Sequence, residues 1–357
     1  MLVKTDFLVE GCILSKDIKG YMGHPIMNKK TILTSELIEV LKVFLIQEVS
    51  VEKMLIDGER FIPKEIIDKE LDDTEDSSDF ITHYLKTVQT YKQLFKNWQA
   101  GSKVEVAIIR SSLIPLVVKA LEEPSAILKL HHYSNKEDYI YHHAISTGLI
   151  GALIAFKMKC ELADIYQVAL GGCLADCGMA KLAPSIFNKA TSLSLEENEE
   201  VQNHPISSYQ MIKDSSIITD SVKLAVLEHH GRLDGSGYPH KMRAKTMHLF
   251  SKIIAVADVF HAMTSERVYR KKQPPFKVVE MILHDSFGQF DITVVQALLA
   301  CFSSFAVGTK VKLNDGSIAE IMFINANSQT RPLVRLYDNG DIIDLGSNRE
   351  IYIEEIL

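Results

Sequence analysis

The stretch HHGRLDGSGYP, residues 229–239, joins two adjacent histidines to an aspartate and a glycine-framed turn. On a helix, neighbouring side chains point about 100 degrees apart, so His229 and His230 can reach two metal ions, or one ion and a substrate oxygen. Gly235 and Gly237 permit the positive φ angles or the close backbone approach that a tight binding loop requires. The alternative is a surface turn that carries a tyrosine, and the stretch by itself does not decide between them.

The sequence around this stretch has helical periodicity. From Phe80 to about Ser304 apolar residues recur at helical spacing, and no run alternates as a strand would. After Phe305, alternating runs flank Asn-Asp-Gly and Asp-Asn-Gly turns, a pattern typical of β-hairpins. Residues 1 to about 55 mix short β-like runs with the helical stretch SELIEVLKVFLI. We therefore predict a mainly α protein with a small N-terminal α+β module and a small C-terminal β appendage.

The domain organisation follows from these changes of pattern. The acidic stretch ELDDTEDSSD has almost no apolar residues and too much like charge to pack, which is typical of a linker. The expected parts are an N-terminal α+β module (1–69), an acidic linker (70–79), connecting helices (80–130), a helical domain (131–304) and a C-terminal β appendage (305–357).

Composition limits the class of protein. The chain has 357 residues, of which 46% are hydrophobic, so it can bury a sizeable core. The net charge of -7 argues against binding DNA or RNA through a broad basic face. Five cysteines scattered through apolar segments are typical of reduced thiols. No signal peptide is indicated, and the longest apolar run, 144–156, is shorter than the roughly 20 residues of a membrane span. We expect a cytoplasmic protein without a membrane span.

Metal-capable side chains recur through the predicted helical domain. The clearest is Asp258, which lies in the apolar helix SKIIAVADVFHAMTS. Burying an ionised carboxylate costs several kcal/mol unless it meets a cation or several hydrogen-bond donors. Taken singly, Asp258 is explained by an internal ion pair, and His143, Asp176 and His204 by packing or capping. Taken together, they supply the imidazole and carboxylate donors that a two-metal site needs.

Five segments, in chain order, carry a resemblance to a known family: YHHAIS, LADCGM, NHPISSYQMI, HHGRLDGSGYP and IIAVADVFHAMTSERVYR. Together they resemble the HD-GYP domain, a subgroup of the HD metal-dependent phosphohydrolases, over about residues 131–303. The resemblance implies an HD-superfamily helical bundle core. Active members hydrolyse the bacterial second messenger cyclic-di-GMP to pGpG or GMP with bound iron, manganese or similar ions. The resemblance therefore implies a bacterial signalling protein that takes a cyclic dinucleotide.

Carried over motif by motif, the resemblance implies metal ligands and substrate contacts. The implied ligands are His143, Asp176 as the bridging carboxylate, His204, His229, His230 and Asp258. The implied catalytic residues are Asp176, His229 and His230. The implied substrate-binding residues are Gly235, Tyr238, Arg267 and Arg270, the two arginines as phosphate contacts. The expected cofactor is a divalent metal, two ions or one, with iron and manganese the first choices.

The chain departs from the family's motifs near this site. The family's dyad reads HDxGK, but Ala175 replaces its histidine and Met179 its lysine. Gly231 replaces the glutamate of HHE, and His261 the second aspartate of DxxD. The resemblance implies that Ala175 removes a ligand from one metal and that Met179 removes a cation from the phosphate. Because removing one preorganised electrostatic group typically lowers a rate by roughly 100- to 1000-fold, we expect impaired catalysis.

A third metal is not expected, because Tyr139 stands where three-metal members have glutamate. His142, His261 and Lys181 are conceivable substitutes for the missing groups, but the sequence does not place them.

Three functions remain open on this basis. The first is a cyclic-di-GMP phosphodiesterase with an altered dyad. The second is a non-catalytic effector or scaffold, in which the altered site binds cyclic-di-GMP or nothing and the N-terminal module or the GYP loop engages a partner protein. The third is another role within the HD superfamily, such as a different phosphoester or a metal-free regulatory domain.

Overall fold

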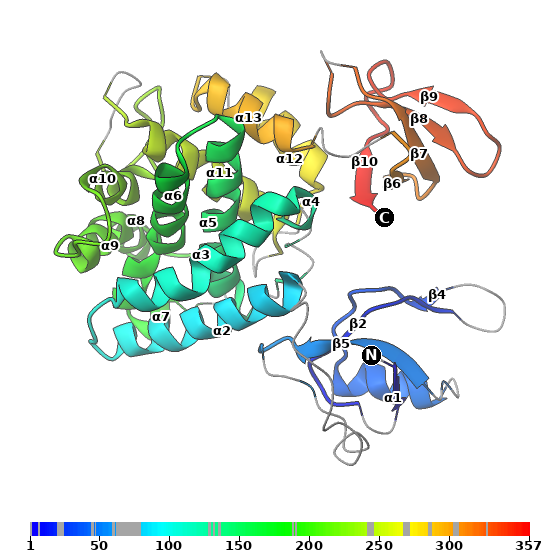
Figure 1. Cartoon of the computed structure of the whole chain (residues 1–357), viewed down its shortest axis with the longest axis horizontal. Coiled ribbons are helices and arrows are strands. Elements are labelled where there is room, and N and C mark those ends of the chain that lie inside the picture. Colours follow the sequence, from blue (N-terminus) through cyan, green and yellow to red (C-terminus); the bar gives the residue numbers. More distant parts are fainter. Residues whose placement is uncertain are drawn as a thin grey trace. The chain divides into compact units, whose positions relative to one another are not determined.

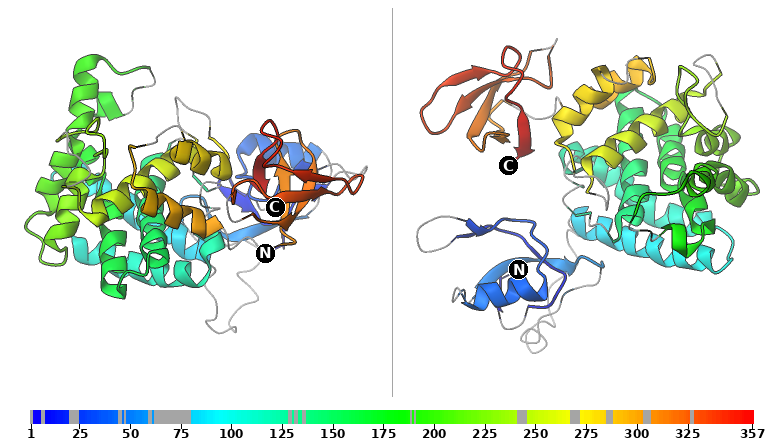
Figure 2. Two further views of the ribbon diagram at one scale, coloured as in Figure 1. Left: turned by 90° about the horizontal axis from the view of Figure 1, so that it is seen from above. Right: turned by 180° about the vertical axis from the view of Figure 1, so that it is seen from behind.

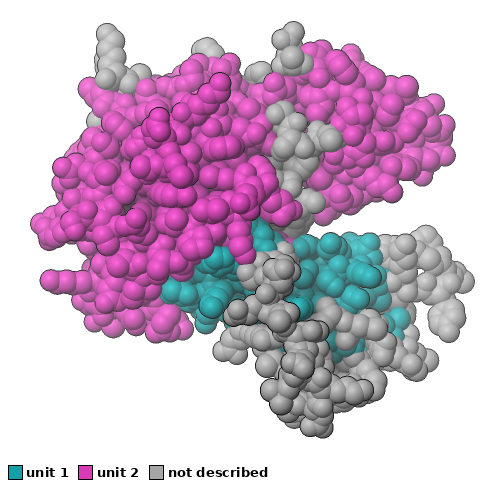
Figure 3. Space-filling view, viewed as in Figure 1, with its two compact units in different colours: residues 1–92 teal, residues 93–357 magenta. Residues whose placement is uncertain are grey.

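The structure of the chain is a computed structural model. The chain folds into two compact units, Met1–Lys92 and Gln93–Leu357 (Figure 3). The residues outside the description are 1, 6–7, 20–24, 44–45, 47, 59–60, 62–79, 128–129, 131–132, 135–136, 188, 190, 241–245, 267–271, 285–287, 303–306 and 326–327. The predicted acidic linker at 70–79 is among them. The domain boundaries drawn from the sequence therefore stay predictions.

The first unit contains a small α+β module. Its elements are β1 (Leu2–Lys4), β2 (Cys12–Leu14), β3 (Ile18–Lys19), β4 (Pro25–Met27), α1 (Ser35–Val43) and β5 (Glu48–Leu55). Strand β5 lies between β1 and β2 in an antiparallel sheet, and β3 pairs with β4. Leu14, Leu33, Leu41 and Val51 are fully buried in its core. The module thus has an apolar core of its own.

Helices make up most of the second unit, which begins within α2 (Figure 1). They are α2 (Phe80–Gln99), α3 (Val106–Glu122), α4 (Pro124–Ile127), α5 (Tyr139–Lys157), α6 (Leu162–Leu174), α7 (Pro184–Phe187), α8 (Leu195–Gln202), α9 (His204–Ile212), α10 (Asp220–Glu228), α11 (Leu249–Thr264), α12 (Pro275–His284) and α13 (Ile292–Phe302). A 3₁₀ helix, Cys177–Lys181, follows α6. The prediction of a mainly α fold with small sheets at both ends is confirmed.

Helix α5 is the central core helix of this unit and packs against α6, α11 and α13. Its residues from Tyr141 to Ala155 are all buried, as expected for a helix that is apolar on every side. The 19 residues from Tyr139 to Lys157 are long and apolar enough, by length and composition, to cross a membrane, although the apolar run in the sequence is shorter. Because 89% of its apolar window is buried inside the protein, α5 has the environment of a core helix.

Two glycines let α5 and α6 approach closely. A Cβ atom on Gly148 would lie 2.6 Å from the carbonyl oxygen of Ala169, and one on Gly172 would lie 3.0 Å from the Cα of Gly148. Contacts under 3.0 Å force the backbone to shift. Since α5 carries His143 and α6 leads into Asp176, this crossing sets how far apart those two side chains lie.

The C-terminal strands form one antiparallel sheet in the order β10-β6-β7-β8-β9, drawn in orange and red in Figure 2. They are β6 (Lys310–Leu313), β7 (Ile318–Phe323), β8 (Leu333–Leu336), β9 (Ile342–Asp344) and β10 (Ile353–Ile356). Gly316 and Gly340, the glycines of the two predicted turns, have φ angles of 90° and 78°, so both predicted hairpins are confirmed. Arg331 Nε donates to Glu280 of α12 at 2.6 Å, which ties the sheet to the helices.

Candidate metal centre

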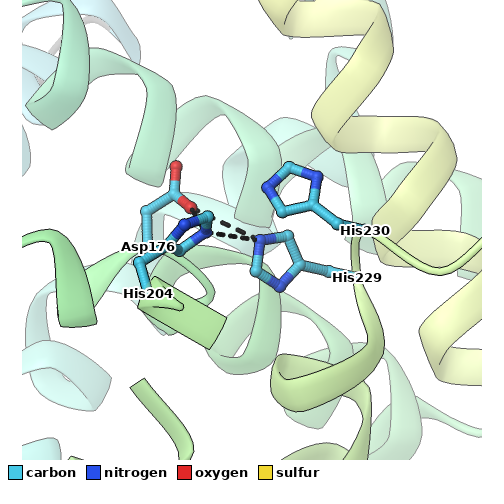
Figure 4. Close-up of side chains that lie close together, drawn as sticks. All are labelled: Asp176, His204, His229 and His230. Carbon is cyan, nitrogen blue, oxygen red and sulfur yellow. Dashed lines mark hydrogen bonds and ion pairs between the residues drawn. The ribbon is translucent and has the colours of Figure 1, made fainter. Parts of the chain in front are cut away.

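The helical unit brings all six predicted ligands together from separate elements. His143 lies in the first turns of α5, Asp176 joins α6 to the 3₁₀ helix, His204 begins α9, His229 and His230 follow α10, and Asp258 lies midway along α11. Their ligand atoms form two groups, in each of which all atoms lie within 4.8 Å of one another. One group is Asp176, His204, His229 and His230, shown in Figure 4. The other is His143, Asp176 and Asp258.

Asp176 belongs to both groups because its two oxygens face different histidines. Oδ1 lies 3.0 Å from Nε2 of His204 and 3.4 Å from Nε2 of His229. Oδ2 lies 3.4 Å from Nε2 of His143, which is itself 2.9 Å from Oδ1 of Asp258. This is the arrangement that a carboxylate bridging two metal ions requires.

The backbone fixes the tautomers of two imidazoles. Nδ1 of His204 lies 2.7 Å from the carbonyl oxygen of Val201, and Nδ1 of His229 lies 2.7 Å from that of Val226. A carbonyl only accepts, so each Nδ1 carries the proton and each neutral ring presents a bare Nε2. The two Nε2 atoms are 3.2 Å apart and both face Asp176. Three acceptors this close repel one another unless a proton or a cation lies among them.

The close approach of these side chains shifts the pKa values of Asp176, His204 and His230. Burial alone raises the pKa of Asp176, but its close pairing with His204 and His229 lowers the pKa of this carboxyl well below its usual value. Burial alone lowers the pKa of His204, and the hydrogen bond to Asp176 reverses this and raises it. Burial and the neighbouring His229 lower the pKa of His230, which keeps that ring neutral and able to bind a metal.

The donor set therefore fits a divalent metal. Neutral imidazoles and carboxylates are the ligands that zinc, iron and manganese take in proteins. His204, His229 and Asp258 are at most 6% exposed, so their polar atoms have no ready access to bulk water. Metal ions would satisfy the acceptors that the protein itself leaves facing one another.

A glycine outside the ligand set positions Asp176. Gly178 N–H donates to Ser208 Oγ at 2.7 Å, and a Cβ atom on Gly178 would lie 2.5 Å from Ser208 N and also meet the carbonyl oxygen of His204. The absence of a side chain lets the 3₁₀ helix pack directly on α9. That contact holds Asp176 beside His204.

Gly178→Ala is expected to separate the 3₁₀ helix from α9, to cost about 1–3 kcal/mol of stability and to weaken metal binding. Chemical denaturation and metal titration measure the two effects. Gly101→Ala is the control, because Gly101 has a φ of 96° but no atom within 4 Å of its Cβ position. That variant should lose stability through backbone strain alone and keep its metal affinity. Unchanged affinity in Gly178→Ala would contradict the positioning role.

The GYP loop covers the histidines. Gly235 has a φ of 84°, and a Cβ atom on Gly237 would lie 2.6 Å from Arg232 N, so the two glycines serve the two purposes expected of them. The ring of Tyr238 stacks on His230 with centroids 4.6 Å apart. Asp234 is exposed and accepts hydrogen bonds from Ser236, which makes it a turn residue apart from both ligand groups.

The predicted phosphate contacts Arg267 and Arg270 lie outside the described residues. Of two other cations considered, only Arg232 interacts with a residue of the site. Arg232 is partly buried, stacks over the ring of Phe290 at 4.6 Å and interacts electrostatically with Asp258. Lys181, considered as a substitute for the missing lysine, is exposed at the end of the 3₁₀ helix. Arg232 is therefore a source of positive charge that the sequence reasoning overlooked, although it lies inside the quoted motif.

Comparison with known proteins matches the helical unit to one family. The model of the HD domain matches residues 128–294. The cyclic di-GMP phosphodiesterase PA4108 of Pseudomonas aeruginosa is 26% identical over 263 residues, which cover 71% of this chain and 63% of that protein. The cyclic di-GMP phosphodiesterase PdeB of Borreliella burgdorferi is 27% identical over 207 residues, covering 57% and 54%. The 3'3'-cGAMP-specific phosphodiesterase 1 of Vibrio cholerae is 28% identical over 178 residues, covering 49% and 40%.

A solved structure shares the fold. Bd1817, a HDG"Y"P protein from Bdellovibrio bacteriovorus, superposes with a TM-score of 0.51 at 15% identity, covering 84% of this chain and 97% of that one. The chain contains an HD domain at residues 128–294, and its motifs resemble those of HD-GYP proteins. It spans 63% and 54% of the lengths of PA4108 and PdeB. HD-domain phosphohydrolases are metal-dependent, in keeping with the two ligand groups.

Two of the departures from the HD-GYP motifs, His261 and Tyr139, lie beside His143. Nδ1 of His261 lies 2.9 Å from Nδ1 of His143, and the hydroxyl of Tyr139 lies 3.2 Å from the same atom. His261 is thus on the far side of the ring from Asp176 and Asp258 and belongs to neither ligand group. If Nε2 of His143 binds a metal, Nδ1 carries the proton and Nδ1 of His261 accepts it. His261 would then act through His143 as a positioning residue.

His142, the other conceivable substitute, is also absent from both ligand groups. His142 is itself 0% exposed. Every face of α5 is covered at this level, so adjacent residues are buried together.

Replacing His261 with phenylalanine is expected to weaken metal binding roughly 10- to 100-fold, because the ring of His143 loses its buried acceptor. His261→Asn retains an acceptor and should recover part of the affinity. Metal titration measures affinity, and the ¹⁵N chemical shifts of the histidine rings report the His143 tautomer. Equal losses in both variants, with the tautomer unchanged, would show that His261 only fills space.

Sequence reasoning also missed the carbonyl groups of Val201 and Val226. Each accepts from a histidine three residues later in the chain. The spacing is visible in the sequence, but it becomes informative only once the histidine is known to stand at the start or end of a helix. The start of α9 at His204 and the end of α10 at Glu228 provide that context.

Proposed function

We propose that this HD-GYP protein is a metal-dependent phosphodiesterase of cyclic dinucleotide signalling whose catalysis is impaired. The observation that carries the proposal is Asp176, whose Oδ1 faces His204 and His229 while Oδ2 faces His143. When bound, divalent ions polarise phosphoryl oxygens and neutralise their charge. Relatives named as cyclic di-GMP and 3'3'-cGAMP phosphodiesterases support a cyclic dinucleotide as ligand, with cyclic-di-GMP the first choice.

The residues around Asp176 supply binding and orientation. Tyr238 and Gly235 form the loop that closes over His230, and Arg232 adds positive charge near Asp258. Arg267 and Arg270 are proposed to hold the phosphates. Ala175 offers no ligand atom and Met179 no charge, so one metal and one phosphate oxygen lose a partner. Binding therefore persists while turnover falls.

The test is a hydrolysis assay with cyclic-di-GMP after reconstitution with Mn²⁺ or Fe²⁺, run beside His229→Ala. We expect slow formation of pGpG by the parent protein, roughly 100- to 1000-fold below the rate of an enzyme with an intact dyad, and none by the variant. Equal rates for the parent and His229→Ala would overturn the catalytic proposal.

A non-catalytic effector is the second candidate, and the combination of an intact histidine group with Ala175 and Met179 favours it. Calorimetry that detects cyclic-di-GMP binding without hydrolysis would support it, and rapid turnover would exclude it. In that case the N-terminal module or the GYP loop engages a partner protein. For either function we place the chain in the cytoplasm, with α5 as a core helix.

A further inference from the structure

The two ligand groups differ in the donors that they offer. The histidine site, consisting of Asp176, His204, His229 and His230, has three imidazoles and one carboxylate. The acidic site, consisting of His143, Asp176 and Asp258, has one imidazole and two carboxylates. Imidazole suits iron, zinc and nickel, whereas carboxylate suits harder ions such as manganese and magnesium. Each site therefore favours a different class of ion.

The histidine site is also held more firmly. His204 and His229 are each fixed at 2.7 Å by a backbone carbonyl, and both present Nε2 toward Asp176 without any rotation of the ring. His143 in the acidic site is held by the side chains of His261 and Tyr139. Ordering a ligand in advance removes an entropic cost of binding. The histidine site has both the larger number of ligands and the greater preorganisation.

Ala175 explains the inequality. It immediately precedes Asp176 and has no atom that can bind a metal, so the acidic site has three protein ligands. Three ligands leave more of an ion's coordination open to water and to exchange than four do. Asp176 and Asp258 place two carboxylates in the acidic site. Their negative charge attracts a divalent cation even though the site has one ligand fewer than the histidine site.

We propose that the two sites bind metal unequally: the histidine site retains one iron or zinc ion, and the acidic site takes a hard divalent cation weakly and reversibly. This rests on the metal-dependent function proposed above and deepens it. Occupancy of the acidic site then follows the free concentration of Mn²⁺ or Mg²⁺. A chain with only the histidine site filled binds a cyclic dinucleotide without completing the two-metal centre.

Elemental analysis and Mn²⁺ titration test the inequality. After purification without chelators and exhaustive desalting, we expect roughly one iron or zinc ion per chain, with Mn²⁺ binding in a second event roughly 10- to 100-fold weaker. Calorimetry gives the affinity, and the electron paramagnetic resonance of Mn²⁺ distinguishes bound from free ion. Two ions retained equally, or no retained ion at all, would overturn the proposal.

Two variants assign the events to their sites. Asp258→Asn should abolish the Mn²⁺ event and leave the retained ion in place, while His204→Gln should lose the retained ion. Circular dichroism checks that each variant is folded. A folded variant that loses both the retained ion and the Mn²⁺ event would contradict separate sites. The readouts require no hydrolysis. If the two sites bind metal unequally but the protein has no affinity for cyclic-di-GMP, the proposed function is wrong and this inference stands. If the protein cleaves cyclic-di-GMP with two equal metal sites, this inference is wrong and the proposed function stands.

Discussion

Asp176→Asn is expected to abolish retention of metal at both sites at once and to reduce any hydrolysis of cyclic-di-GMP at least roughly 100-fold. Both ligand groups share this carboxylate, and its two oxygens face different histidines at 3.0–3.4 Å. Asparagine preserves the shape and can donate to Nε2 of His204, so the folded protein is retained. Elemental analysis and the metal-induced shift in Tm measure the loss.

Asp234→Asn is the matched control for this variant. Asp234 is an exposed aspartate of the GYP motif that bonds to Ser236 and belongs to neither ligand group. It should keep its metal content and its Tm shift. Asp176→Asn with a full complement of metal would contradict the bridging role, as would an equal loss in Asp234→Asn.

The double variant Ala175→His, Met179→Lys is expected to gain hydrolysis roughly 100- to 1000-fold over the parent chain. The histidine restores a fourth ligand to the acidic site, and the lysine restores a cation for the phosphate. The histidine should also convert the weak Mn²⁺ event into a tightly retained ion. Single-turnover assays and metal titration measure the two gains separately.

Ala175 is only 3% exposed, so a histidine there must find room at the end of α6. Thermal unfolding therefore accompanies the assay, and Met179→Lys alone is the control that leaves α6 untouched. A folded double variant that acquires the tight ion but no hydrolysis would show that the phosphate side of the centre is remodelled. That result would favour the effector function.

The fold could be predicted largely because local chemistry and global structure agree. Helical periodicity is continuous across the helical unit, and glycines at 316 and 340 mark hairpin turns that only residues tolerant of positive φ can form easily. The close crossing of α5 and α6 could not be predicted. It depends on Gly148 meeting Gly172, two glycines that no periodicity pairs.

The candidate site could be predicted in composition but not in geometry. Asp258 stands out as a carboxylate in an apolar helix, and the structure buries it beside His143 and His230. The division of the ligands into a histidine site and an acidic site depends on which oxygen of Asp176 faces which ring. The role of His261 likewise depends on the side of His143 that it contacts. Such facts follow from packing, which a one-dimensional pattern does not contain.

The ligands come from distant parts of the chain, which has a consequence for unfolding. His143 and Asp258 are 115 residues apart in sequence, and His204 and His229 are 25 apart, yet each pair is within 3.2 Å. An ion held between such residues closes long loops of the unfolded chain, as a disulfide does. A bound ion would thus act as a reversible cross-link among α5, α9, α10 and α11, and a cell that withholds metal would loosen the domain.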